Sequence, residues 1–185
     1  MNRLFVVLAL ALFAVLPAAN AAAPVLDPEN TLYMDLPKGR VVIELLPNLA
    51  PHTVDQIKKL TRTGFYDGTP FHRVIPGFMA QGGDPTGTGG GGSSLPDLKA
   101  EYSNAHFTRG TLGMARGDDP DSANSQFFIC FKDCGDLDGQ YTIFGQVVSG
   151  MEFVDALKAG DPNVADGQVA KPDKLVKMQV AADAK

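Results

Sequence analysis

The sequence is short of the residues that several common functions require. Its 16 Lys and Arg are outnumbered by 21 Asp and Glu, which gives a formal net charge of -5 at pH 7. The chain has no excess of basic residues that would bind a phosphate backbone, so we expect no nucleic acid partner. The three histidines have no metal-ligand spacing such as His-Glu-x-x-His, and there is no Gly-x-Ser-x-Gly nucleophile motif. These absences argue against a metal site and against a serine hydrolase.

Cysteine is also scarce, because Cys130 and Cys134 are the only two in the chain. An extended step of four residues spans about 13 Å, whereas bridged Cα atoms lie roughly 4.4–6.8 Å apart. A disulfide would therefore need a sharp turn after Phe131, which Lys132-Asp133 permits. The alternative, a buried Cys130 thiol that packs as a small apolar group, is favoured.

One long apolar run stands at the start of the chain, from Leu4 to Leu16. It is too short for a comfortable membrane span, which needs about 20 residues. Arg3 precedes it, and Ala19-Asn20-Ala21 follows with the small residues that a signal peptidase recognises. We therefore predict a signal peptide over residues 1–23, cleaved after Ala21 or Ala23, with no stable membrane anchor afterwards. The alternative is an uncleaved anchor. Export predicts a periplasmic protein or, alternatively, a secreted one.

The sequence contains 20 Gly and 13 Pro, which is typical of many short strands joined by turns. Alternating apolar residues predict a hairpin over 31–45 and further strands over 71–75, 78–82, 111–115, 125–131, 141–148 and 175–180. Helical spacing predicts one helix from Pro51 to Gly64 and a second within 150–160. The pattern alone indicates a β-barrel or sandwich with two helical lids.

Glycine dominates residues 82–94. A phosphate-binding loop would end in Gly-Lys-Ser/Thr and lead into an amphipathic helix, and neither feature is present. We interpret this segment as a flexible loop on the rim of a peptide groove.

The most informative stretch runs from Phe71 to Asp84 and combines a guanidinium, an amide and several large apolar side chains. Pro76-Gly77 separates two extended segments within it. If these segments are neighbours, Arg73, Phe78 and Gln81 share one face beside Met79. The stretch contains no evident nucleophile.

This stretch resembles the signature of the cyclophilin family of peptidyl-prolyl cis-trans isomerases. Two later blocks are also similar to the family: 113–116 leading into 125–129, and 137–139 followed by 143–145. The resemblance covers the chain from Asn30 to its end and predicts an isomerase domain over 30–181. It implies a mostly β fold, a closed eight-stranded antiparallel barrel capped by a helix at each end. It also implies an enzyme that acts on proline-containing peptides and on unfolded or partly folded proteins, with no cofactor and no covalent step.

The resemblance also implies roles for individual residues. Arg73 would be the catalytic group, and Gln81 would position it and bind substrate backbone. The proline pocket would consist of Phe78, Met79, Phe128 and Leu137, with Tyr141 at its edge. Ala115 and Arg116 would bind the residue before proline through their main chain, with Gln126 nearby. The alternative for Phe78, Phe128 and Leu137 is an ordinary place in the barrel core.

Three positions depart from the best-studied members of the family. Asp136 stands where they carry a Trp that is associated with binding cyclosporin, so we expect weak inhibition by that compound. Tyr141 replaces a frequent His, and Arg116 replaces a common Asn. The long Arg116 side chain is expected to favour acidic residues near the substrate proline.

Two other classes of function stay open at this point. One is a non-catalytic peptide-binding module or holdase that uses the same groove without needing Arg73, and the other is a hydrolase on a similar barrel. We expect a monomer that accelerates the folding of envelope or secreted proteins.

Overall fold

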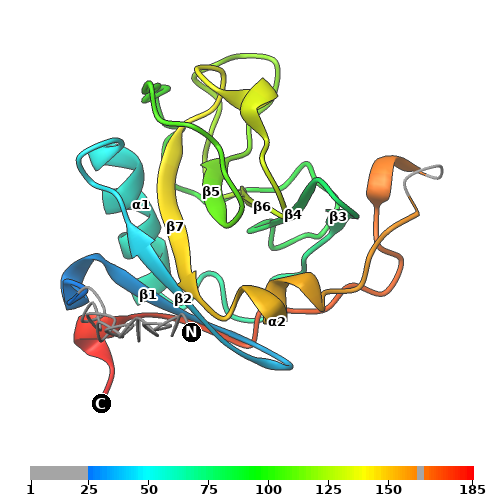
Figure 1. Ribbon diagram of the computed structural model, residues 1–185, viewed down its shortest axis with the longest axis horizontal. Helices are drawn as coiled ribbons and strands as arrows, with labels where there is room; N and C mark the ends of the chain where they lie inside the picture. The colour runs from blue at the N-terminus through cyan, green and yellow to red at the C-terminus, as the bar shows by residue number, and fades with distance from the viewer. Residues whose placement is uncertain (1–24, 162–164) are drawn as a thin grey trace, which may run out of the picture.

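The computed structural model describes residues 25–161 and 165–185 (Figure 1). The predicted signal peptide lies outside the described residues. Within them, no helix is long and apolar enough to cross a membrane.

One antiparallel sheet dominates the described part of the chain, and its strands overlap every strand predicted from the sequence. The strands are β1 (Thr31–Leu36), β2 (Gly39–Leu45), β3 (Arg73–Ile75), β4 (Met79–Gly82), β5 (Thr111–Met114), β6 (Phe127–Cys130), β7 (Ile143–Ser149) and β8 (Lys177–Val180). Their order across the sheet is β3-β4-β6-β5-β7-β2-β1-β8. The predicted hairpin over 31–45 is confirmed as β1 and β2, which pair from Thr31 with Glu44 to Leu36 with Gly39.

The sheet is curled but open, so the prediction of a closed barrel is wrong. Among the described residues, the edge strands β3 and β8 do not pair with each other. The segment before β8 instead meets the β3 side through isolated bridges, which join Pro70 to Lys174 and Arg73 to Gln168. From the first bridge to the second, one segment advances by three residues and the other by six, so the two bridges do not share a register and no continuous ladder forms.

Helix α1 (Pro51–Arg62) confirms the first predicted helix and lies along one side of the curled sheet (Figure 1). Ala50, at its N-cap, makes no side-chain cap. The carboxylate of Glu101 replaces one, because it accepts hydrogen bonds from the backbone N–H of His52 at 3.0 Å and of Thr53 at 2.8 Å, and from the Thr53 hydroxyl at 2.7 Å. A residue far along the chain thus satisfies donors that every helix start leaves free.

The second predicted helix is much shorter than expected, because α2 covers only Met151–Asp155. Beyond it, the Lys158 N–H donates to the Asp173 carboxylate at 2.9 Å, and the Gly160 N–H donates to the Val74 carbonyl at 2.9 Å. These bonds turn the chain toward β3 and prevent further helical turns.

The core is divided into two clusters. The larger fills the interior of the sheet and includes the fully buried rings of Tyr66, Phe71, Phe127 and Phe144. The smaller consists of Met79, Phe107, Phe128, Cys130, Cys134 and Ile143. Both cysteines are buried and free, so the structure contains no disulfide between them, and burial raises the pKa of each thiol. This second cluster lies directly beneath the candidate site.

Candidate active site

A cavity of about 200 Å³ opens over the smaller core cluster. Nine of the ten predicted site residues line it: Arg73, Phe78, Met79, Gln81, Ala115, Arg116, Phe128, Leu137 and Tyr141. The tenth, Gln126, lines a neighbouring cavity of about 460 Å³ together with the glycine-rich residues 89–92. The two cavities share Gln81, Ala115 and Arg116, so they form one continuous groove.

The strand pairing explains why these side chains meet. The hairpin of β3 and β4 turns at Pro76-Gly77 and sets Arg73 directly opposite Gln81, where side chains of paired strands share a face. Next to it, β6 pairs with β4 and sets Phe128 opposite Gln81. Residue positions that are separated in the sequence are thereby brought side by side, as the sequence predicted for Arg73 and Gln81.

Phe128 forms the floor of the cavity and is 5% exposed. Phe107 stacks against its buried side at 5.6 Å between ring centroids, and Tyr141 meets it edge-on at 5.7 Å. A Cβ atom at Gly113 would lie 2.3 Å from the Phe128 ring, so only glycine there leaves room for it. Phe128 therefore belongs to the core and also lines the cavity, so both interpretations made from the sequence, barrel core and pocket wall, apply to it.

The groove wall near Tyr141 carries a second guanidinium. The Arg116 guanidinium lies 4.7 Å from the centroid of the Tyr141 ring. It also donates to the backbone carbonyls of Gln140 at 3.1 Å and Gly117 at 2.8 Å. Ala115 donates its N–H to the Gln126 carbonyl at 2.9 Å. The wall is thus built from hydrogen bonds as well as from apolar contacts.

A directional series of hydrogen bonds runs from Arg73 along the groove. Arg73 Nη1 donates to Gln81 Oε1 at 3.2 Å, and Gln81 Nε2 donates to Gln126 Oε1 at 2.9 Å. Gln126 Nε2 then donates to the carbonyls of Gly89 at 2.9 Å and Gly91 at 2.7 Å. Every amide in the series accepts on one side and donates on the other, an arrangement in which neighbouring bonds polarise one another.

The series ends at a buried carboxylate. Asp84 is 0% exposed and accepts hydrogen bonds from the N–H groups of Gly89 at 2.7 Å and Gly91 at 3.2 Å. It also accepts from the N–H and the hydroxyl of Thr86, both at 2.8 Å. Burial by itself would raise the pKa of Asp84, but these four hydrogen bonds outweigh it and hold that pKa below its usual value. The glycine-rich segment is wrapped around this carboxylate and lies on the rim of the groove, as predicted.

Arg73 has a second partner that the sequence did not reveal. Its Nε donates to the carbonyl of Asp166 at 3.0 Å, and its Nη2 donates to the Asp166 carboxylate at 2.8 Å. A guanidinium has five N–H donors. Asp166 and Gln81 occupy three of them, and the other two, one on each terminal nitrogen, have no hydrogen-bond partner in the described part of the chain.

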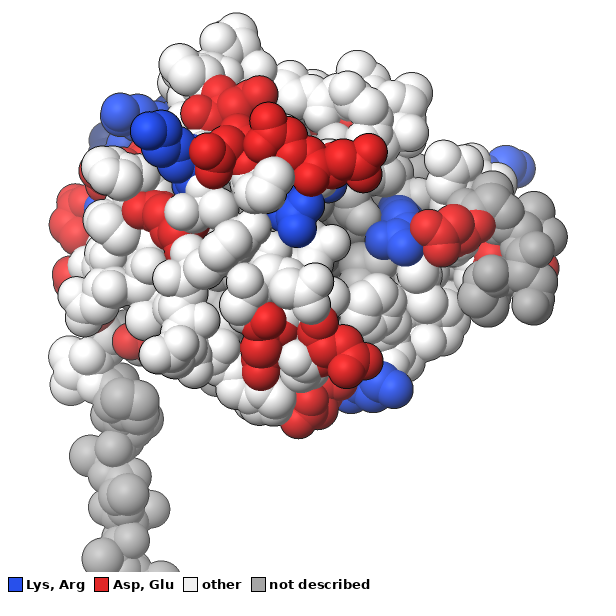
Figure 2. Space-filling model, turned by 90° about the horizontal axis from the view of Figure 1, so that it is seen from above, with Lys and Arg blue, Asp and Glu red and all other residues white. Residues whose placement is uncertain are grey.

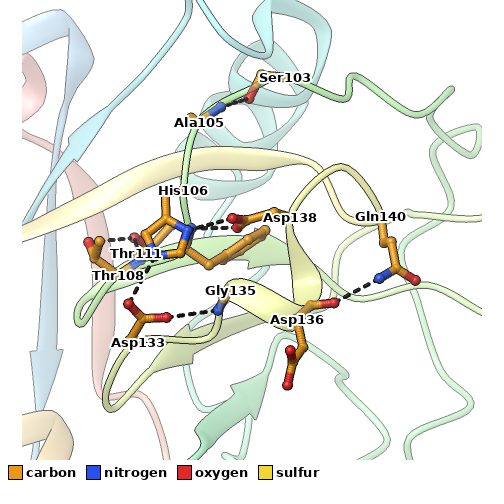
Figure 3. Close-up of polar contacts among 11 residues, drawn as sticks. Ser103, Ala105, His106, Thr108, Thr111, Asp133, Gly135, Asp136, Asp138 and Gln140 are labelled. Atoms are coloured by element: carbon orange, nitrogen blue, oxygen red, sulfur yellow. Dashed lines mark hydrogen bonds and ion pairs between the residues drawn. The ribbon is translucent and has the colours of Figure 1, made fainter.

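The loop that carries Leu137 is held by a charged cluster that the sequence also did not reveal (Figure 3). His106 lies between two carboxylates, with Nε2 at 2.9 Å from Asp133 and Nδ1 in a short contact with Asp138. Asp138 and then Asp133 raise the pKa of His106 to about 9, and His106 lowers the pKa of both carboxyls. Asp138 also accepts from the Phe107 N–H at 2.8 Å, so the cluster connects the Leu137 loop to the ring behind Phe128.

Within residues 25–161 and 165–185, no group of three or more His, Cys, Asp or Glu side chains is placed to hold a metal ion. The face of the molecule in Figure 2 carries acidic side chains in separate groups with isolated basic groups among them. That face presents no continuous basic surface.

Comparison with known proteins places this chain in a known family. The family model described as "Cyclophilin type peptidyl-prolyl cis-trans isomerase/CLD" matches residues 31–180. A "Probable peptidyl-prolyl cis-trans isomerase" from Brucella suis is 52% identical over 178 residues, which cover 90% of each chain. "Peptidyl-prolyl cis-trans isomerase B" from Bacillus subtilis is 45% identical over 134 residues, which cover 71% of this chain and 93% of the relative.

Solved structures agree with this grouping. Cyclophilin AquaCyp293 from Hirschia baltica superimposes with a TM-score of 0.76 at 30% identity and covers 86% of this chain and 77% of its own. A Cryptosporidium parvum cyclophilin type peptidyl-prolyl cis-trans isomerase, solved in the presence of the dipeptide Ala-Pro, gives a TM-score of 0.74 at 30% identity and covers 81% and 98%.

Proposed function

Because the chain belongs to the cyclophilin-type peptidyl-prolyl cis-trans isomerases, we propose that the groove around Arg73 is where it rotates X–Pro bonds. The chain is thus an enzyme, and the interpretations as a non-catalytic binding module or a hydrolase are set aside.

Rotation about an X–Pro bond breaks amide resonance, with a barrier of about 18–20 kcal/mol. In the twisted state the prolyl nitrogen regains its lone pair, which the planar ground state does not offer. A hydrogen-bond donor aimed at that nitrogen therefore stabilises the transition state alone, which is the condition for raising the rate. The reaction needs no covalent intermediate.

Arg73 is the donor for this step. One observation supports this assignment. The Arg73 guanidinium borders the 200 Å³ cavity, and its contacts to Gln81 and Asp166 leave two of its N–H groups available to a substrate. Arginine stays protonated at any working pH, and its planar fork is rigid. Phe78, Met79, Phe128 and Leu137 grip the proline ring, and Tyr141 closes the edge of this pocket.

The larger cavity receives the residues that precede the proline. Ala115 and Arg116 border both cavities, so their main chain lies beside the bond that rotates. Gln81 holds Arg73 and binds substrate backbone, and Gln126 supports Gln81 from the side of the glycine-rich rim. Arg116 favours acidic side chains next to the proline.

NMR exchange spectroscopy on a short X–Pro peptide with catalytic amounts of the protein tests the role of Arg73. Wild-type protein is expected to produce cis–trans exchange within the mixing time, and Arg73→Ala is expected to lose most of that exchange while its circular dichroism is unchanged. Arg73→Lys is the matched variant, because it keeps the charge but lacks the fork. Full turnover by a folded Arg73→Ala protein would remove Arg73 from the mechanism.

The proposed setting is the bacterial envelope, where the protein, exported and monomeric, accelerates the folding of periplasmic or secreted proteins. The apolar run, the basic start and the small residues at 19–23 support export. Fractionation of cells that produce the protein, with mass measurement of the periplasmic form, tests this location. A mature form that begins after Ala21 or Ala23 is expected, and an uncleaved protein in the cytoplasmic fraction would contradict it. Light scattering of the purified protein tests the monomer.

A further inference from the structure

Asp166 has an unusual backbone conformation. With φ at 51° and ψ at 44°, it is the only residue other than glycine with positive φ among the described residues. This left-handed region costs energy for most side chains and is better tolerated by Asp and Asn. A residue that is held there in spite of this cost usually has a structural or functional reason.

The surrounding chain fixes the segment against β3. A Cβ atom on Gly167 would lie 2.5 Å from the Ile75 side chain, and one on Gly160 would lie 2.1 Å from the Gly167 carbonyl. An isolated bridge pairs Arg73 with Gln168. These close approaches leave little freedom for the segment to slide along the strand that carries Arg73, which is visible beside it in Figure 1.

In this left-handed conformation, the carbonyl and the carboxylate of Asp166 both accept hydrogen bonds from the Arg73 guanidinium. The Asp166 carbonyl receives Nε of Arg73 at 3.0 Å, and the carboxylate receives Nη2 at 2.8 Å. Gln81 holds Nη1 from the opposite side at 3.2 Å. Three contacts at three nitrogens fix both the position and the plane of the guanidinium, and the two remaining N–H groups are aimed by that plane.

We propose that Asp166 is a positioning residue for Arg73, and that its backbone matters more than its charge. The Asp166 side chain is 80% exposed, and an ion pair this exposed is weak and screened by salt. The carbonyl contact, in contrast, depends only on the left-handed conformation. The proposal rests on the catalytic role proposed for Arg73.

Three substitutions separate the backbone from the charge. Asp166→Asn and Asp166→Gly both keep the left-handed conformation accessible, and with it the carbonyl contact, but remove the carboxylate. Asp166→Val disfavours that conformation and removes both contacts. Asp55→Val, on the exposed face of α1, is the control for an added β-branched surface residue.

The expected order of kcat follows from this design. Asp166→Asn and Asp166→Gly should lower kcat by about 2- to 3-fold. Asp166→Val should lower it by about 10-fold or more, since small misplacements of a catalytic group are costly. KM should change little, because the proline pocket is untouched. Salt should not restore the Val variant. In an Arg73→Ala background, Asp166→Val should have no further effect, which a purely structural role would not produce.

A folded Asp166→Val protein with wild-type kcat would overturn the proposal, as would equal losses of kcat in Asp166→Gly and Asp166→Val. If Arg73→Ala itself kept full turnover, the proposed function would fail instead, so the two failures are distinguishable. If the Val variant did not fold, the Gly variant would decide by NMR. Its Arg73 Nε–H should keep the chemical shift and slow solvent exchange of a bonded proton, and rapid exchange would contradict the backbone contact.

Discussion

Replacing Asp84 with Asn tests how the glycine-rich rim is built. One carboxylate oxygen accepts both hydrogen bonds from Thr86, and the other accepts the N–H groups of Gly89 and Gly91. An amide has one oxygen and one NH₂ group. In either orientation of the new amide, its NH₂ group therefore faces groups that are themselves donors, from Thr86 on one side or from Gly89 and Gly91 on the other.

The cheaper orientation directs the NH₂ group toward Thr86, because the Thr86 hydroxyl can turn and accept. One N–H group is then left unpaired beside a fully buried side chain, at about 1–3 kcal/mol. The bonds from Gly89 and Gly91 also lose their charge assistance. We expect a total loss of about 2–4 kcal/mol, against a typical stability of about 5–15 kcal/mol, so the variant should still fold.

Urea unfolding followed by far-ultraviolet circular dichroism measures this loss. With a slope near 2 kcal/mol per M, the midpoint should fall by about 1–2 M at pH 7 without a change in slope. Asp118→Asn, at an exposed position, is the control and should leave the midpoint unchanged. An unchanged midpoint in Asp84→Asn would refute the reasoning.

The pKa of Asp84 adds a pH dependence to the same experiment. Because folding lowers this pKa, the ionised carboxylate contributes its full stabilisation above the unfolded value, near 3.9. That contribution is lost as pH falls through the folded pKa. The difference in urea midpoint between wild type and Asp84→Asn should therefore be constant from pH 5 to 8 and should decrease in acid. A difference that grows toward low pH would contradict a lowered pKa for Asp84.

Three further predictions concern other parts of the molecule. Glu101→Ala should destabilise the fold by about 1–2 kcal/mol, since it leaves the first N–H groups of α1 uncapped; an unchanged urea midpoint would refute this role. The pKa of His106 is raised to about 9 in the fold, so its contribution is complete below the unfolded value near 6.5 and is lost as pH rises through 9. The difference in midpoint between wild type and His106→Gln should accordingly vanish by pH 10, and equal differences at pH 6 and pH 10 would count against the cluster with Asp133 and Asp138. Asp136→Trp should strengthen inhibition of the isomerase by cyclosporin, and an unaltered inhibition curve would show that this position does not limit binding.

The parts of the site that the sequence predicted are those set by local pairing. Arg73 and Gln81 belong to one hairpin around Pro76-Gly77, so alternation alone places them on one face. The parts that it missed depend on contacts between distant segments. Neither the cap that Glu101 provides for α1 nor the two contacts of Asp166 leaves a local pattern in the chain.

The errors in the predicted fold have similar causes. The segment before β8 meets the β3 side through two isolated bridges of different register, a mismatch between distant segments that leaves no pattern in the sequence, and the barrel stays open there. The apolar spacing after Gly150 favours a longer helix, but backbone hydrogen bonds from Lys158 and Gly160 to other segments end it early. Tertiary bonds override local preference at these positions.

The open seam of the sheet has a mechanical consequence for catalysis. β3 carries the guanidinium and has a ladder on one side only, whereas the other side is held by scattered bonds to the segment that contains Asp166. A strand bound in this way can shift or fray at lower cost than the interior strands β5 and β7. Amide hydrogen exchange should therefore be faster at Val74 than at Leu112. The proposed catalytic guanidinium thus lies on an edge strand, and local opening of the loop across the seam would release it while the interior strands stay paired.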